Sequence, residues 1–324
     1  MRTPLSAPVA IAALTLGGLL ACHSDSATAP DREPGPLFQL GGGQVLTVDN
    51  DLGDCPHADF TTIQAAVTAA EPGATIHVCA GTYHEQVTIA KNDLRLLAKG
   101  KPGQVVLDGF DLHDMFAGFL LSDAHGNLIQ GFVVQNYHEA NIRLDGGSSG
   151  NTIRQNVARS SSHHDGIQIV DSPRNLIELN ETSDNVSPGQ VACGINVIGP
   201  ESDGNVVRHN ESFGNDFGIQ VAAQASDNLV FHNYSHDNRR FGIRTVGGVT
   251  GTLLANNRAL DNAGPGIALL FFSSGNTVER NRAFNNAPDL LQDATSAGNT
   301  FENNHCRTSA PAGLCEHSEG ASPK

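Results

Sequence analysis

Residues 160–170, SSSHHDGIQIV, join two histidines and an aspartate to a short apolar stretch, and their residue types are suited to proton transfer. An imidazole accepts a proton near neutral pH, so His163 or His164 can act as a general base. Asp165 can orient the ring of a neighbouring histidine. The alternative is that these residues form only the polar turn before a buried strand, as HDNRRFG at 236–242 does without catalytic character.

A repeated segment determines how these residues would be positioned. The pattern Gly-Ile-x-apolar occurs five times, and its last four glycines are 24 residues apart. NIRLD at 141 and GFLLS at 118 extend the pattern towards the N-terminus. Strands that recur at such a period cannot bury a core singly, so they must stack. The five glycines are Gly166, Gly194, Gly218, Gly242 and Gly266.

Asparagine recurs three times in most repeats, at intervals of five residues. Buried asparagine amides can bond those above and below in a ladder, and we expect asparagine to adopt the left-handed backbone angles of the corners. Three short strands per repeat with such corners predict an all-β fold, a single-stranded parallel β-helix with three short strands per coil. The three sets are Asn151, Asn175, Asn205, Asn228, Thr252, Asn276 and Asn299; Asn156, Asn180, Asn210, Asn233, Asn257, Asn281 and Asn304; and Ser161, Asn185, Asn215, Asn238, Asn262 and Asn286.

The repeat also predicts a polar column on the outside. In Gly-Ile-x-apolar the isoleucine points inward, so the next residue points outward. His164 and Asp165 should then lie beside this column, and the long loop that ends at Cys193 should rise on the same side. Oriented amide and guanidinium donors can neutralise a carboxylate as charge grows on it. We assign catalysis to His163, His164, Asp165 and Arg143, and substrate binding to Gln168, Asn196, Gln220, Arg240 and Arg244.

The sequence predicts where the β-helix begins and ends. In DFTTIQAAVTAAEPG, Phe60, Ile63 and Val67 share one helical face, which predicts an N-terminal helix that covers the open end of the first coil. Thr61 with Gln64 is typical of a capping box. We expect the β-helix to span residues 41–305 and a C-terminal loop and tail to span 306–324.

The N-terminus predicts export. Residues 1–21 have the charge and apolar pattern of a signal peptide. LLAC at 19–22 resembles a bacterial lipobox, which implies lipidation of Cys22. His23 then favours the outer membrane or cell surface, because an aspartate at that position favours the inner membrane. A plain signal peptide cleaved near Ala21 is the alternative. Residues 22–40, rich in Ser, Pro and charge, predict a flexible tether.

Export makes disulfides plausible, and the cysteines suggest two. We pair Cys55 with Cys79 around the expected helix and Cys306 with Cys315 in the tail, which leaves Cys193 as a buried thiol. The net charge of −15 makes nucleic acid an unsuitable partner. We expect contact with a membrane only through the N-terminal lipid.

One stretch carries a resemblance to a family. Residues 54–89, DCPHADFTTIQAAVTAAEPGATIHVCAGTYHEQVTI, resemble the N-terminal cap and first coil of pectin-lyase-like right-handed β-helix proteins. The later coils are similar to the Asn-rich repeats of carbohydrate-binding and sugar-hydrolase modules and of NosD-type copper-site maturation proteins. SHHDG is similar to the DPHD stretch of alginate epimerases, without the proline and the first aspartate. The resemblance covers roughly 45–305 and implies right-handedness; its members include lyases, hydrolases, esterases, epimerases and non-enzymes, so it fixes no activity.

Two functions remain as hypotheses. One is a surface-anchored protein that binds or processes polysaccharide, as a lyase or C5-epimerase of uronic-acid polymers, with His164 removing the proton beside a carboxylate that Arg143 neutralises. The other is a non-catalytic structural or adhesin-like β-helix that binds glycans or a protein partner. The scarcity of aromatic side chains and the net charge favour the second, whereas the long loop beside His164 favours the first.

Calcium is the one cofactor that the sequence suggests. DNDLGD at 49–54 is similar to a calcium loop, but Phe60 stands where the bidentate glutamate belongs, which favours a surface turn. A second acidic stretch, LDGFDLHDM, contains Asp108, Asp111, His113 and Asp114. Such loops are usually solvated, so no metal ligand is assigned.

Overall fold

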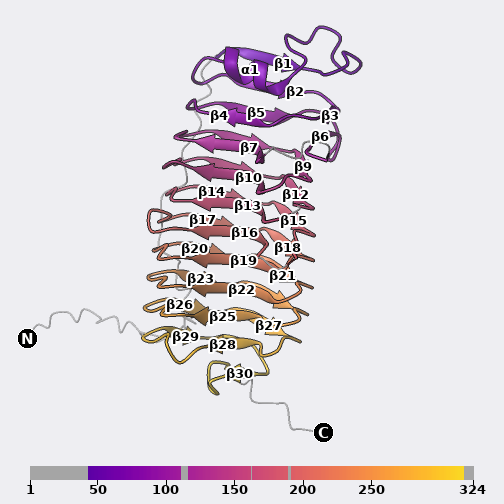
Figure 1. Cartoon of the computed structure of the whole chain (residues 1–324). Helices are drawn as coiled ribbons and strands as arrows, with labels where there is room; N and C mark the ends of the chain where they lie inside the picture. The colour runs from indigo at the N-terminus through magenta and orange to yellow at the C-terminus, as the bar shows by residue number, and fades with distance from the viewer. Residues whose placement is uncertain (1–42, 111–115, 162, 189–190, 317–324) are drawn as a thin grey trace, which may run out of the picture. The chain divides into compact units, whose positions relative to one another are not determined.

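The computed structural model describes residues 43–110, 116–161, 163–188 and 191–316. Within them the chain winds into coils, and the strands of successive coils pair in parallel as three sheets, sheet A of eleven strands, sheet B of nine and sheet C of ten. From β2 to β28 each coil passes from sheet A to sheet B to sheet C, and the coils stack from β1 to β30 (Figure 1). The predicted all-β parallel β-helix is confirmed.

The strand bounds show how short each wall of a coil is. Sheet A consists of β1 (Val45–Val48), β2 (Thr75–Val78), β5 (Arg95–Ala98), β8 (Leu128–Gln130), β11 (Thr152–Arg154), β14 (Leu176–Glu178), β17 (Val206–Arg208), β20 (Leu229–Phe231), β23 (Leu253–Ala255), β26 (Thr277–Glu279) and β29 (Thr300–Glu302). Sheet B consists of β3 (Gly81–Tyr83), β6 (Val105–Asp108), β9 (Val133–Gln135), β12 (Val157–Arg159), β15 (Glu181–Ser183), β18 (Glu211–Phe213), β21 (Tyr234–His236), β24 (Arg258–Leu260) and β27 (Arg282–Phe284). Sheet C consists of β4 (Val87–Ile89), β7 (Ala117–Ser122), β10 (Ala140–Asp145), β13 (Asp165–Val170), β16 (Cys193–Ile198), β19 (Phe217–Ala222), β22 (Phe241–Val246), β25 (Ile267–Leu270), β28 (Leu290–Gln292) and β30 (Ser309–Ala310).

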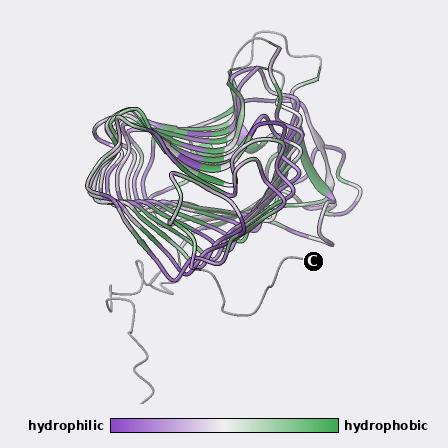
Figure 2. Ribbon diagram, turned by 90° about the horizontal axis from the view of Figure 1, so that it is seen from below, coloured by the Kyte–Doolittle hydropathy of each residue, from purple (hydrophilic) through white to green (hydrophobic). Residues whose placement is uncertain are grey.

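The three walls differ in the size of the side chains that they send into the interior. Seen along the stack, the three walls of successive coils superpose around a common centre (Figure 2). Sheets A and C send buried isoleucine, leucine and valine inward, whereas the middle position of sheet B is small in every central coil. Small residues there leave room for the larger side chains of the other two walls, because a protein interior packs at nearly constant density. The sheet B positions are Ala158, Thr182, Ser212, Ser235, Ala259 and Ala283.

Buried asparagine side chains join each coil to the next, as the repeat predicted. In the ladder from Asn156 to Asn304, each Nδ2 donates to the Oδ1 of the following asparagine at 3.0–3.2 Å. The same Oδ1 also accepts the backbone N–H of the preceding coil, at 2.8–3.0 Å for example at Asn281 and Asn180. All the hydrogen-bonding groups of these buried amides are therefore used between coils.

The expectation that these asparagines adopt left-handed angles is wrong. The left-handed residue is the one before each ladder asparagine, for example Leu179 (φ 57°), His209 (φ 54°) and Arg280 (φ 54°). The ladder asparagines themselves keep negative φ, because their side chains must point into the corner to reach the next coil. The selection for asparagine is thus for its amide.

The repeated glycine of sheet C is explained by the third ladder. A Cβ at Gly242 would lie 2.7 Å from Asn262 Nδ2 and 2.6 Å from the Gly266 carbonyl oxygen. Where the corner residue is Ser161, the strand carries Asn141 in the glycine's place, and Asn141 Nδ2 donates to Asn185 Oδ1 at 3.2 Å. A glycine on the strand beside an asparagine at the corner therefore fills the same space as an asparagine on the strand beside a serine at the corner.

The N-terminal helix is present, but its cap differs from the prediction. Helix α1 (Ile63–Ala69) packs against β4, β1 and β2. Thr62, and not Thr61, is the N-cap, and its hydroxyl accepts from the Ala65 N–H at 3.3 Å. The first-turn N–H groups of Ile63 and Gln64 are bonded by the Glu85 carboxylate, at 2.8 and 2.9 Å. A capping box with Gln64 is therefore not formed.

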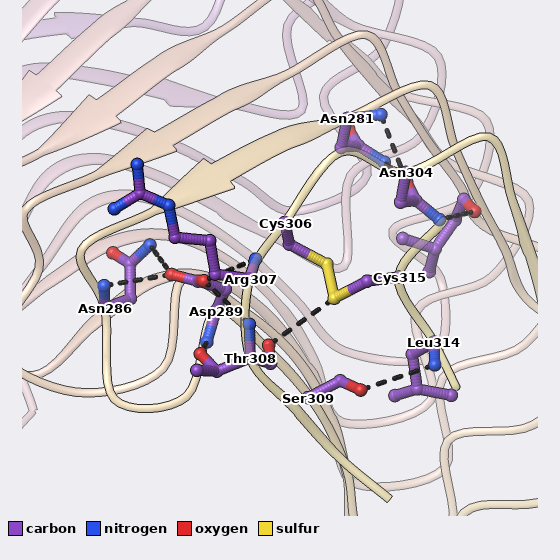
Figure 3. The surroundings of a disulfide bond; sticks show 11 residues. Asn281, Asn286, Asp289, Asn304, Cys306, Arg307, Thr308, Ser309, Leu314 and Cys315 are labelled. Atoms are coloured by element: carbon purple, nitrogen blue, oxygen red, sulfur yellow. Dashed lines mark hydrogen bonds between the residues drawn. A yellow bond between two sulfur atoms is a disulfide. The ribbon is translucent and has the colours of Figure 1, made fainter. Parts of the chain in front are cut away.

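The C-terminal end closes with a disulfide and a carboxylate. Cys306 and Cys315 are bonded, as are Cys55 and Cys79 near the N-terminus. Asp289 accepts from Asn286 Nδ2 at 3.1 Å, so it ends the third ladder (Figure 3). Strand β30 pairs with β28, so the stack continues past residue 305 into the segment that we expected to be loop and tail.

Cys22 and the tether lie outside the described residues. Among the residues that the structure describes, no helix is long and apolar enough to cross a membrane.

We predict that Gly242→Ala lowers the free energy of unfolding by about 1–3 kcal/mol, because the added methyl group overpacks the corner. Gly242→Asn combined with Asn262→Ser recreates the arrangement of Asn141 and Ser161, so this double variant should be more stable than Gly242→Asn alone. Urea denaturation of the single and double variants measures the coupling. Additive losses would show that the two side chains do not share a space.

We also predict that Asn257→Ala destabilises the protein by about 3–5 kcal/mol, since it removes four buried hydrogen bonds. These join Asn257 to Asn233, Asn281 and the Val230 carbonyl. Asn285→Gly is the matched control, because Asn285 is exposed, donates only to Asp261 at 2.9 Å and has a left-handed backbone angle (φ 61°) that glycine adopts without strain. Equal losses in the two variants would contradict a structural role for the ladder.

Candidate functional site

Five polar residues form a continuous column on the outer face of sheet C. Strands β10, β13, β16, β19 and β22 pair in parallel with these residues directly side by side. The register is the one that the glycine spacing predicted. We call the set the outer column; its members are Arg143, Gln168, Asn196, Gln220 and Arg244.

The outer column is a directed chain of hydrogen bonds that converges on Asp165. From one end, Arg143 donates to Gln168 Oε1, and Gln168 Nε2 donates to Asp165 Oδ2 at 2.8 Å. From the other end, Arg244 Nε donates to Gln220 Oε1 at 2.6 Å, and Gln220 Nε2 donates to Asn196 Oδ1 at 2.9 Å. Asn196 Nδ2 completes this arm by donating to Asp165 Oδ2 at 3.0 Å.

The chemistry of the end groups fixes the direction of both arms. A guanidinium can only donate and a carboxylate can only accept, so each amide between them has one orientation. The three amide side chains are buried, and their oriented groups already have partners within the protein. The side chains of the outer column therefore donate to one another, whereas binding of a substrate by these amides would require free donors.

Asp165 lies at the centre of this chain and is 1% exposed. Its second oxygen, Oδ1, accepts the backbone N–H of Cys193 at 2.7 Å. Burial raises the pKa of the Asp165 carboxyl, and the hydrogen bonds from Asn196 and Cys193 act against that rise. From the sequence we expected Asp165 to orient a histidine, but its carboxylate instead accepts the hydrogen bonds in which both arms of the outer column end.

His164 lies at one end of the outer column, beside Arg143. Its side chain is 29% exposed, and its Nε2 is 3.7 Å from Glu139 Oε2. The other oxygen of the same carboxylate, Oε1, is 3.8 Å from Arg143 Nη1. Glu139 thus bridges a partly exposed imidazole and a guanidinium, an arrangement that can hold a base and a carboxylate-binding group close together.

Arg143 is held from several directions. Besides Gln168 and Glu139, it contacts Asp145 Oδ2 through Nε at 3.2 Å, and its guanidinium lies 4.8 Å from the ring centroid of Phe116. These contacts fix the guanidinium, and because Glu139 and Asp145 already balance its charge, a further carboxylate has to compete with them.

His163 belongs to a different contact. Its ring stacks on His138, with centroids 4.0 Å apart and planes at 21°. The three residues of the original motif therefore divide: His163 stacks on His138, His164 faces Glu139, and Asp165 bonds to the amides.

Two phenylalanines at the other end of the outer column were not anticipated. The Arg244 guanidinium lies 3.7 Å from the ring centroid of Phe217, and Arg240 lies 4.8 Å from the same ring. Phe217 also stacks on Phe241 in the next coil, with centroids 5.6 Å apart. Their place immediately before the repeated glycine is the signal that could have found them.

The long loop lies where the sequence predicted, between β15 and β16, beside the shorter turn that carries His163 and His164. It leads into Cys193, whose thiol is buried next to Asp165. Burial raises the pKa of this thiol well above its usual range, and the neighbouring Asp165 adds to the rise. The thiol is therefore an inert neighbour of the outer column.

A hollow of about 490 Å³ lies at the corner between sheets A and B, where Lys101, Gln155, Leu179 and His209 line it, and not over the outer column. His209 stacks on His232 there, with centroids 5.1 Å apart.

The acidic stretches suggested for calcium have local partners instead. Asp49 accepts the Cys55 N–H at 2.6 Å, and Asp108 accepts from Gln135 and Asn136 at 3.0 and 2.8 Å. Asp111, His113 and Asp114 lie outside the described residues. Within residues 43–110, 116–161, 163–188 and 191–316, no group of three or more His, Cys, Asp or Glu gathers where it could hold a metal ion.

Comparison with solved structures identifies the same architecture in several proteins. Pectate lyase Pel9A matches with a TM-score of 0.66 and 14% identity, covering 87% of this chain and 83% of that one. XylC, solved in complex with xylose, matches with a TM-score of 0.63 and 12% identity, covering 81% and 70%. The A-module of the mannuronan C-5 epimerase AlgE4 from Azotobacter vinelandii matches with a TM-score of 0.51 and 18% identity, covering 71% and 76%.

At these identities the likeness concerns the fold alone. No curated protein matches the sequence. A family model described as a right handed beta helix region matches residues 97–259 and 160–321, which together span more than half of the chain. The stacked coils, the asparagine ladders and this match agree, and the chain belongs to the right-handed β-helix family.

Proposed function

We propose that this protein binds an acidic polysaccharide along the outer face of sheet C and processes it there, as a lyase or C5-epimerase of uronic-acid polymers. The observation that carries the proposal is the group formed by His164, Glu139 and Arg143, in which a partly exposed imidazole lies beside a guanidinium held by the outer column. Both reactions begin with removal of the proton next to the sugar carboxylate.

In the proposed mechanism, His164 accepts that proton, and Arg143 binds the carboxylate as negative charge develops on it. Glu139 positions both groups. Asp165, Gln168, Asn196 and Gln220 act indirectly, because their chain of hydrogen bonds fixes Arg143 and Arg244 and does not itself touch the sugar. Arg240 and Arg244 bind carboxylates further along the polymer, and His163 lines the path beside His164.

The comparisons support the substrate class. A pectate lyase and a mannuronan C-5 epimerase share the fold, and their names describe action on uronic-acid polymers. Calcium enters the proposal only as an addition to the assay, since polyuronates bind it themselves.

We predict that the full chain forms unsaturated ends on polygalacturonate or alginate, measured by ultraviolet absorbance with and without calcium, or exchanges the C5 proton with deuterated solvent. His164→Gln should lower either rate by about 10²–10⁴-fold, the usual contribution of a general base. Measuring proton exchange as well as absorbance covers epimerisation, which leaves no unsaturated end.

His236→Gln is the matched control for this experiment. His236 also lies against carboxylates, with Nε2 3.1 Å from Glu211 Oε1 and Nδ1 2.6 Å from Asp237 Oδ2, but it is on sheet B. Its replacement should leave the rate unchanged. Absence of both signals across the panel, or an equal loss in the two variants, would remove His164 as the base.

A second candidate function, glycan binding without catalysis, is favoured by one pair of residues. Phe271 and Phe272 follow β25 and are 58% and 66% exposed, although both have left-handed backbone angles. The preceding coil uses Gly247 and Gly248 at these positions, as the backbone bonds Gly247 N–H to Leu270 O and Gly248 N–H to Phe271 O indicate. Non-glycine residues there cost about 1–2 kcal/mol each, and Ala223 and Gln224 adopt the same angles one coil earlier still, so it is the exposure of the two rings that favours a use in binding.

We predict that Phe271→Gly with Phe272→Gly raises the free energy of unfolding, because glycine adopts left-handed angles without strain. The same double variant should bind polygalacturonate more weakly, as measured by affinity electrophoresis, since sugar rings stack on exposed aromatic rings. A gain in stability with unchanged binding would reject the two rings as a sugar platform.

The proposal includes anchoring of the protein to the outer membrane or cell surface through a lipid on Cys22. Replacement of this residue by serine should release the protein from the membrane fraction of cells that export it. Persistence in that fraction after Cys22→Ser would contradict the lipid anchor.

A further inference from the structure

The outer face of sheet B carries three arginines near its C-terminal end. Arg258 on β24 and Arg282 on β27 are exposed and lie directly side by side in the parallel register. Arg307 follows on the next coil, where His305 pairs with Arg282 in an isolated bridge. Its side chain extends away from the Cys306–Cys315 bond (Figure 3). We call Arg258, Arg282 and Arg307 the arginine face.

The guanidinium groups of the arginine face have no ion-pair partner among the described residues, although the Asp289 carboxylate accepts the backbone N–H of Arg307 at 3.0 Å. Arginines elsewhere have such partners: Arg208 Nη2 is 2.7 Å from Glu178 Oε2, and Arg280 Nη1 is 3.3 Å from Glu279 Oε1. Arg258 and Arg282 are therefore cations without a carboxylate partner, on a chain whose net charge is −15.

Aromatic rings hold two of the three guanidinium groups. Arg258 lies 4.7 Å from the ring centroid of Tyr234, and Arg307 lies 5.6 Å from that of Phe284. Stacking on a ring restrains a guanidinium while leaving its N–H donors directed outward. Restrained donors lose less freedom when they bind an anion, so the ring contacts prepare the site.

The register makes an anionic ligand favourable. Neighbouring strands are about 4.8 Å apart, so Arg258 and Arg282 present two cations on adjacent strands, and an anion that contacts both is favoured. A polymer with regularly spaced carboxylates can run along the stack and meet Arg258 and Arg282 on successive coils. Arg307 lies two residues beyond His305, over the ring of Phe284, so it would contact such a polymer from one side. A single small anion can reach only one or two of these arginines.

We infer that the arginine face binds an acidic polysaccharide at a site separate from the outer face of sheet C. The need for a polyanion follows from the unpaired arginines, whereas the choice of a uronic-acid glycan rests on the proposed function. The site lies on a different sheet from His164, so it adds affinity for long polymers without taking part in the chemistry.

Binding to polygalacturonate tests the inference, with the full chain in a Cys22→Ser background so that no lipid is attached. We expect Arg258→Gln with Arg282→Gln to weaken binding about tenfold, equivalent to about 1.4 kcal/mol. The matched control is Arg208→Gln with Arg280→Gln, which removes the same charge from arginines that already have carboxylate partners. The control should bind within twofold of the parent, and neutral dextran should bind none of the proteins.

Each other result would overturn the inference. Equal weakening in both double variants would show a response to net charge alone. Preference for vesicles that contain phosphatidylglycerol over polygalacturonate would assign the face to lipid. Arg258→Gln with Arg282→Gln separates this inference from the proposed function: it should keep the catalytic rate of the parent on short oligogalacturonates, and binding through the arginine face can persist even if no variant shows catalysis.

Discussion

The coils from Asn127 onward depend on asparagine side chains that are buried at their corners and bonded to the next coil. A buried amide without partners destabilises a fold by about 1–3 kcal/mol for each unsatisfied group, so a shift of one coil against another is strongly opposed. The ladder from Asn156 to Asn304 shows the regular case, in which each Oδ1 accepts both a side-chain and a backbone N–H. Parallel pairing then places equivalent residues of successive coils side by side.

The outer face of sheet C follows from this register. Arg143 and Arg244 end the outer column, and Asp165 accepts the hydrogen bonds that reach it from both sides. The chain of bonds restrains the guanidinium groups that a polyuronate would contact, while each of its amides is buried and bonded at both its oxygen and its nitrogen. A site of this kind has few free groups, which suits recognition of carboxylates by fixed cations better than hydrogen bonding to many hydroxyls.

Much of the fold could be predicted from the sequence, because in a parallel stack the period of Gly-Ile-x-apolar is also the period of the register. The outer column was predictable for the same reason. Strict alternation, however, puts Asp165 on the same side as Ile167, which points inward. The pairing of β10 with β13 skips Gly166, and this interruption turns Asp165 outward to meet Gln168 and Asn196.

Other features depended on residues that are distant in the chain. The N-terminal turn of α1 is bonded by Glu85, more than twenty residues after it, which no local capping rule can foresee. The place of Asn141 in the third ladder depends on Asn185, 44 residues away. The stacking of His163 on His138 also joins neighbouring coils, and therefore the motif at 160–170 could not be divided into its separate contacts from the sequence.

The stability of Asp165→Asn tests the central claim, that two arms of hydrogen-bond donors converge on one carboxylate. Asparagine has nearly the same shape, but its NH₂ group would face donors whose directions Arg143 and Arg244 fix. The account predicts a loss of about 1–3 kcal/mol in the free energy of unfolding by urea. Asp216→Asn, which changes a carboxylate that accepts one bond from the Ser187 N–H, should lose clearly less. Equal losses, or an unchanged stability for Asp165→Asn, would contradict the account.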